Sequence, residues 1–217
     1  MTPMEPAAWK QAWGMDRLTF GREDNRQLPP IARGFLASHG LPRVMIFEGT
    51  FEGANPFEIR FEPLSKKLVP YNSTVTWGDF YDAAQDQAWS EQLVIAEEEF
   101  CNGYASYCVH RSAENVTRID VEIPEPEMFV NSNLPLFGES LLLATQWSDG
   151  NSSKNVPISP KEWKASLLKL TKAITAIDSK VSDGRSSFWP YLIDYIREGG
   201  PGLFEITSDP ARSQSRF

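Results

Sequence analysis

The hydrophobic residues of this chain change their spacing partway along, and that change constrains the fold most. Within residues 43–123 there are clear alternating runs, such as the one in which Phe57, Ile59 and Phe61 would share one face. Alternation of this kind is typical of β-strands with one solvated face. Beyond residue 133 the apolar residues recur every three or four positions, which is typical of amphipathic helices. Successive strands followed by successive helices predict an α+β fold, with an antiparallel sheet and helices beside it.

The alternating region predicts a series of strands separated by turns. The clearest strands are Arg43–Glu48, Phe57–Phe61, Leu93–Ala96, Tyr104–His110 and Val116–Ile123. Weaker candidates are Leu68–Tyr71 and Ser73–Trp77. The segment Phe80–Ala88 fits either a short helix or an acidic loop. Asn102-Gly103 is a turn dipeptide that suits a hairpin between two of these strands.

Helices are expected on both sides of the strands. Their predicted ranges are Pro6–Trp13, Pro30–His39, Leu134–Trp147, a helix from Pro160 to Ile177, and Ser187–Glu198. The clearest start is Ser159-Pro160-Lys161-Glu162, where Ser159 and Glu162 can form a capping box. Trp9 and Trp13 lie four residues apart on one helical face, so we expect them to dock the first helix onto the body. Ser148–Val156 is interpreted as a polar loop.

The length of the chain favours a single domain. Its 217 residues fall in the size range of one domain, with the body at about 6–204 and a flexible tail at 205–217. The first residues have neither the basic nor the apolar region of a secretory signal, and no stretch reaches the length of a membrane span. A cytoplasmic protein without a membrane partner is therefore expected; its oligomeric state is left open.

The charge balance is strongly acidic. Lys and Arg number 21 against 29 Asp and Glu, which gives a net charge of −8. Such a surface repels phosphates, so nucleic acid is not an expected partner. It attracts basic proteins and speeds their encounter, although plain solubility explains it equally well.

Residues for catalysis are scarce. The chain has His39, His110, Cys101 and Cys108, and it lacks the H-E-x-x-H, phosphate-loop and nucleophile-elbow motifs. The spacing of the cysteines does not suit a zinc site. Cys108 and His110 could share a strand face, so a nucleophile–base pair is conceivable. We therefore predict no catalytic residues, no cofactor and no metal.

Acidic residues form the one excess. They lie in three groups: Asp79, Asp82 and Asp86; Glu97, Glu98 and Glu99, placed just after a predicted strand; and Glu122, Glu125 and Glu127. Such groups can be a solvated face, a docking patch for a basic protein, or paired carboxylates for acid–base catalysis. The candidate partner-binding residues are Asp79, Asp82, Asp86, Glu97, Glu98 and Glu99.

Five segments, in order along the chain, resemble one family. They are Phe35-Leu-Ala-Ser-His-Gly-Leu-Pro42, Val94-Ile95-Ala96, Asn102-Gly103 through Val109, Phe129-Val-Asn-Ser-Asn-Leu-Pro-Leu-Phe137 and Ser187-Phe-Trp-Pro-Tyr-Leu192. They are similar, in turn, to the helix exit, the strand ending, the hairpin strand, the helix entry and the FW-containing helix near the C-terminus in the fourth SUKH family of immunity proteins. Ala96 stands where that family tends to have glycine.

The resemblance implies both a fold and a role. The fold would be α+β, with a mixed, largely antiparallel, twisted sheet flanked by helices. The role would be non-enzymatic: binding a bacterial toxin, often a nuclease or a deaminase, and blocking it. A basic toxin would be electrostatically complementary to this acidic chain. A SUKH-like adaptor or scaffold for a cellular partner, and a small hydrolase that uses acidic residues, are the alternatives.

Overall fold

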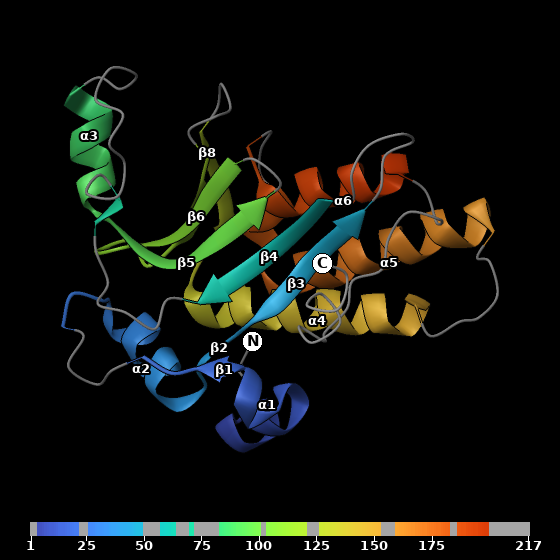
Figure 1. Cartoon of the computed structure of the whole chain (residues 1–217), viewed down its shortest axis with the longest axis horizontal. Helices are drawn as coiled ribbons and strands as arrows, with labels where there is room; N and C mark the ends of the chain where they lie inside the picture. The colour runs from blue at the N-terminus through green and yellow to red at the C-terminus, as the bar shows by residue number, and fades with distance from the viewer. Residues whose placement is uncertain are drawn as a thin grey trace.

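A six-stranded sheet with three long helices packed together beside it forms the body of the computed structural model (Figure 1). The structure describes residues 4–21, 26–49, 57–63, 70–71, 83–100, 103–120, 126–152, 159–182 and 186–199. The predicted tail, 205–217, lies outside these ranges. Strands in succession followed by helices in succession confirm the α+β class.

The order of the strands in the sheet is their order in the chain. The strands are β3 (Val44–Gly49), β4 (Phe57–Pro63), β5 (Gln92–Phe100), β6 (Gly103–His110), β7 (Val116–Ile119) and β8 (Glu127–Asn131). Each pairs antiparallel with the next. A second sheet pairs β1 (Leu18–Thr19) with β2 (Leu41–Pro42). Within the described residues, parallel pairing is confined to an isolated bridge between Phe129 and Ser187.

The helices follow the predicted order. They are α1 (Pro6–Trp13), α2 (Pro30–Ser38), α3 (Ala83–Ser90), α4 (Leu134–Ser152), α5 (Pro160–Ile177) and α6 (Phe188–Gly199), with short 3-10 turns η1 (Met15–Arg17) and η3 (Ser179–Ser182). The capping box at the start of α5 is present: Ser159 Oγ accepts from the Glu162 amide, and the Glu162 carboxylate accepts from the Ser159 amide. The helix alternative for Phe80–Ala88 is realised in part by α3.

Helix α4 is longer than predicted. The interpretation of Ser148–Val156 as a loop is wrong for its first five residues, which continue the helix; 153–158 lie outside the described residues. Ser148 is buried, and the side-chain amide of Asn151 donates to the Trp147 carbonyl at 2.7 Å. These polar side chains are therefore accommodated within the last turns of the helix.

The strands differ from the prediction at several places, and the short pair β1 and β2 was not predicted. β5 extends to Phe100, because its backbone pairs with both β4 and β6, so the run from Glu97 to Glu99 belongs to a strand. β8 was missed, although its buried Met128 and Val130 alternate with the exposed Glu127. The predicted strand Val116–Ile123 is confirmed to Ile119, and 121–125 lie outside the described residues. Most residues of the two weaker strand candidates also lie outside the described residues. Of those that are described, Pro70 forms an isolated bridge with Leu93.

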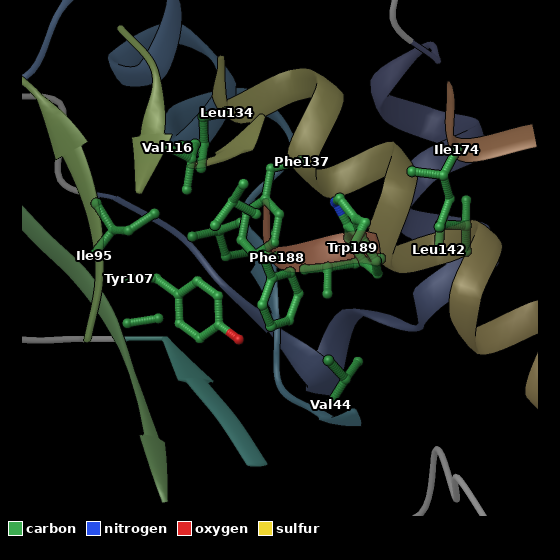
Figure 2. Close-up of a cluster of buried hydrophobic side chains, with 14 of the residues drawn as sticks. Val44, Ile95, Tyr107, Val116, Leu134, Phe137, Leu142, Ile174, Phe188 and Trp189 are labelled. Atoms are coloured by element: carbon green, nitrogen blue, oxygen red, sulfur yellow. The ribbon is translucent and has the colours of Figure 1, made fainter. Parts of the chain in front are cut away.

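The main hydrophobic core fills the space between the sheet and the helices (Figure 2). Its centre is aromatic: Tyr107 of β6 stacks on Phe137 of α4 with ring centroids 5.5 Å apart and meets Phe188 of α6 edge-on at 5.7 Å. α5 packs against α4 and α6 through Trp163, Leu167, Leu170 and Ile174, all buried. Burial of this much apolar surface is the main favourable term in the stability of the fold.

A second, smaller cluster lies on the other face of the sheet. It consists of Tyr71, Trp89, Val94, Cys108 and Ile119, all buried. Successive strand residues point to opposite faces, so Cys108 lies on this face and its neighbour Tyr107 on the core face. Trp89 connects the cluster to α3, and its ring meets Tyr71 edge-on at 5.3 Å.

A buried polar junction joins the end of the sheet to three helical segments. Asp178, just after α5, accepts hydrogen bonds from the Ser132 amide at 2.6 Å, the Ser132 hydroxyl at 3.0 Å and the Lys180 amide at 3.2 Å. Asn131 accepts from the Trp189 indole at 3.0 Å and donates to the Ser140 hydroxyl at 3.3 Å. Because each partner lies on a different element, the junction fixes β8, α4, α5 and α6 relative to one another.

The N-terminal helix docks as predicted. Trp9 and Trp13 are both buried, and Trp9 meets Phe35 of α2 edge-on at 5.4 Å. The approach depends on Gly138 of α4, where an added Cβ would lie 2.8 Å from the Phe35 ring and 2.9 Å from the Trp9 ring. A glycine at this position therefore allows α1 and α2 to pack closely against α4.

Candidate functional site

The pair formed by Cys108 and His110 does not have the arrangement of a nucleophile and its base. Cys108 is fully buried in the small cluster. Burial raises the pKa of its thiol well above the ordinary value, and the nearby Glu127 carboxylate raises it further. A neutral, inaccessible thiol is a poor nucleophile, because the thiolate is the reactive form.

His110 has a structural role at the end of β6. Its Nδ1 accepts the amide hydrogens of Ser112 and Ala113 at 3.2 and 3.1 Å. Two backbone donors at Nδ1 place the ring hydrogen on Nε2. His110 thus caps the turn between β6 and β7, as an Asx-type side chain would.

His39 also has a structural role. Its Nε2 lies 2.8 Å from the Met4 carbonyl, and its ring stacks on Phe35 with centroids 4.7 Å apart. A carbonyl can only accept, so Nε2 donates and ties the N-terminal segment to the end of α2.

The described residues contain no group of three or more His, Cys, Asp or Glu side chains that could hold a metal ion. Cys101, the other cysteine, lies outside the described residues, so its role stays a prediction. Over the same ranges, the helices are too short or too polar to cross a membrane.

The predicted acidic residues fall on two elements. Asp86 is exposed on α3, and Glu97 is exposed on β5. The backbone register sets Glu98 opposite Phe61 and Ala105, and Glu99 opposite Arg60 and Tyr104. Asp79 and Asp82 lie outside the described residues. The run from Glu97 to Glu99 is therefore held in the regular geometry of a strand, and not in a loop.

Asp86 and Glu97 are too far apart to act as a catalytic pair. α3 leads into the start of β5, and Figure 1 shows it extending away from the sheet. Glu97 lies five positions after Gln92 on β5, a distance of about 17 Å at the usual rise per residue of a strand. Paired carboxylates in glycosidases are roughly 5–9.5 Å apart. A protein interface of standard size buries about 800 Å² per partner, so a single partner could cover both residues.

Two further acidic residues have partners inside the fold. Glu127 Oε1 accepts from the Trp89 indole at 2.6 Å, and this hydrogen bond ties β8 to α3. Asp120 pairs with the buried Arg118 at 3.1 Å. Glu127 had been grouped with the acidic excess; its contact with a residue 38 positions away has no short-range signal in the sequence.

Comparison with known families gives one match. A family model described as SUKH-4 immunity protein matches residues 6–195, from the start of α1 into α6. No curated protein matches the chain, and no solved structure matches it.

Proposed function

The chain belongs to the SUKH-4 immunity protein family, and on that premise we propose that it binds a cognate protein toxin and blocks it without catalysing a reaction. Family membership supports a toxin-immunity role and is the observation that carries the proposal. The match spans α1 to α5, the six strands of the large sheet and the first two thirds of α6, so it concerns the described fold and not a single motif.

The chemistry of the described side chains supports binding as the mode of action. His39 and His110 are engaged in structural hydrogen bonds, and the Cys108 thiol is buried and protonated at neutral pH. The described surface can therefore recognise a partner through its charge and its shape. Binding that covers the toxin's working surface would be sufficient for neutralisation.

The acidic residues of α3, β5 and the segment before α3 are the proposed contact surface. They are Asp79, Asp82, Asp86, Glu97, Glu98 and Glu99. Asp86 and Glu97 are exposed, and a net charge of −8 would accelerate encounter with a basic toxin such as a nuclease. We propose the cytoplasm as the place of action.

The experiment is a binding measurement with the toxin-like product of a neighbouring gene. The wild-type chain should form a tight complex and abolish the toxin's activity. Glu97→Lys should lower the association rate about threefold to tenfold at low salt, with less effect at high salt, because exposed charges act mainly on encounter. Glu198→Lys, an exposed site on α6, is the matched control and should leave the rate unchanged.

Two outcomes would contradict the proposal at different levels. Unchanged kinetics for Glu97→Lys, and for the reversal of Glu98 and Glu99 with it, would show that the acidic residues only solubilise the protein. A stable complex with a cellular protein, together with no complex with any neighbouring toxin, would instead support the adaptor alternative.

A further inference from the structure

Helix α5 presents a line of positive charge on the side away from the core. Its buried residues are Trp163, Leu167, Leu170 and Ile174, and its lysines are Lys161, Lys164, Lys169 and Lys172, all exposed. At about 100° per residue, Lys161, Lys164, Leu168 and Lys172 fall within an arc of about 80°. These four residues are called the lysine stripe below.

The lysine stripe runs against the electrostatic preferences of a helix. Cations are favoured at a helix C-terminus, yet the last turn of α5 has no basic residue, while Lys161 and Lys164 lie in its first two turns. Lys161 with Lys164, and Lys169 with Lys172, are like charges three positions apart, which repel. Among the described residues, no carboxylate lies within ion-pair distance of any of these lysines. Four lysines are thus concentrated on the exposed side of α5, whose one carboxylate is Glu162, on a chain whose net charge is −8.

An apolar side chain lies at the centre of the stripe. Leu168 is 56% exposed, one turn after Lys164 and one turn before Lys172, and the small Ala165 beside it is exposed too. An exposed apolar side chain among charged ones offers a partner both apolar area to bury and charge to pair, and protein–protein interfaces combine the two. Contacts to nucleic acid phosphates do not need such a centre, and the net charge opposes them.

We propose that the lysine stripe is a docking surface for an acidic amphipathic helix of a second protein. Charge complementarity selects the partner: its carboxylates would pair with Lys161, Lys164 and Lys172, and its apolar residues would cover Leu168 and Ala165. From Lys161 to Lys172 the stripe is about 16 Å long, so about three turns of a partner helix suffice. This surface is separate from the acidic one on α3 and β5, and does not depend on the identity of the toxin.

The test uses the full chain and an 18-residue helical peptide with leucine at the a and d heptad positions and glutamate beside them. We expect the peptide to bind in a salt-dependent way. The double variant Lys164→Glu/Lys172→Glu should weaken binding at least tenfold, and Leu168→Gln should weaken it about threefold to tenfold. Lys180→Glu, exposed on η3 outside the stripe, is the control and should change binding less than twofold.

Other results would overturn the proposal. These are failure of the peptide to bind, equal binding by all variants, or equal binding of a peptide with lysine in place of glutamate. A DNA duplex that binds more tightly than the peptide, and is released by the same substitutions, would replace the protein partner with a nucleic acid. Circular dichroism of each variant confirms that the helix remains folded.

The same variants separate this proposal from the toxin-binding one. Lys164→Glu/Lys172→Glu should leave the toxin association rate within twofold, and Glu97→Lys should leave peptide binding within twofold. If the lysine stripe variants abolished toxin neutralisation while Glu97→Lys had no effect, the toxin would occupy α5. The acidic surface would then be the wrong assignment.

Discussion

Tyr107 and Cys108 are neighbours on β6, yet they belong to regions of very different extent. Tyr107 points toward the helices and lies between Phe137 and Phe188 in the main core. Cys108 points the other way, into a cluster of five buried residues next to α3. Stability is therefore concentrated on the helix-covered face. The opposite face contributes less, and it carries the exposed Glu97 on the neighbouring strand.

The largest effect is expected from Phe137→Ala on the helix-covered face. Phe137 is fully buried against Tyr107, so truncation removes apolar contacts and leaves a cavity. We expect the free energy of unfolding to fall by about 3–5 kcal/mol, measured by urea denaturation. If Phe137→Ala lowered the free energy of unfolding by less than a substitution in the small cluster does, the face that carries the small cluster would be the more stabilising of the two.

Gly138→Ala tests how closely α1 and α2 pack against α4, which covers the same face of the sheet as Phe137. Its Cβ would come within 3 Å of the Phe35 and Trp9 rings, so these must shift, and we expect a loss of about 1–3 kcal/mol. Gly150→Ala, in the same helix with no atom within 4 Å, is the control and should gain about 0.5–1 kcal/mol from helix propensity. Equal effects at the two positions would show that packing at Gly138 is not tight.

Trp89→Phe tests the attachment of α3 to the smaller cluster. The substitution keeps a ring but removes the indole donor to Glu127, a hydrogen bond to a charged acceptor. Thermal or urea denaturation should show a loss of about 1–2 kcal/mol, because Glu127 is exposed and water can replace the donor. Glu127→Gln keeps an acceptor and should cost less. If it costs more, the charge of Glu127 has a role beyond this bond.

The smallest expected effect is the part of the pH dependence of stability that comes from the buried Cys108 thiol. The pKa of Cys108 is raised in the folded state, so above about pH 8.5 the unfolded chain loses a proton that the folded chain keeps. The free energy of unfolding should therefore fall as pH rises, by at most about 1.4 kcal/mol per unit from this group. Cys108→Val should lack this component, which appears as the difference between the two pH profiles. Identical profiles would mean that the thiol titrates normally in the folded protein.

Local features of the sequence predicted the helices well. Ser159 and Glu162 form their capping box within one turn, and the apolar spacing of α5 identifies its buried face. The docking of Trp9 followed from its spacing with Trp13. These features depend on neighbours in the chain, so the sequence alone contains the information.

Features that depend on distant partners could not be predicted. β5 includes Glu97 because β4 and β6 pair with its backbone, which composition does not encode. Glu127 belongs to a strand and holds Trp89, 38 positions away. Asp178 reaches Ser132 across 46 positions. For the candidate site, the sequence suggested acidic residues, which stay a prediction, while the separation between Asp86 and Glu97 became visible only in the fold.

Because each strand of the sheet pairs with its neighbour in the chain, the sheet can form hairpin by hairpin during synthesis. The helices α4 to α6, which cover its apolar face, follow β8 and span the roughly 70 residues after it, from Leu134 to Gly199. At about 5–20 residues per second, Tyr107 and the strand residues around it would wait several seconds for that cover. The nascent chain is therefore prone to aggregation in the interval when the sheet is complete and α4 to α6 are still missing.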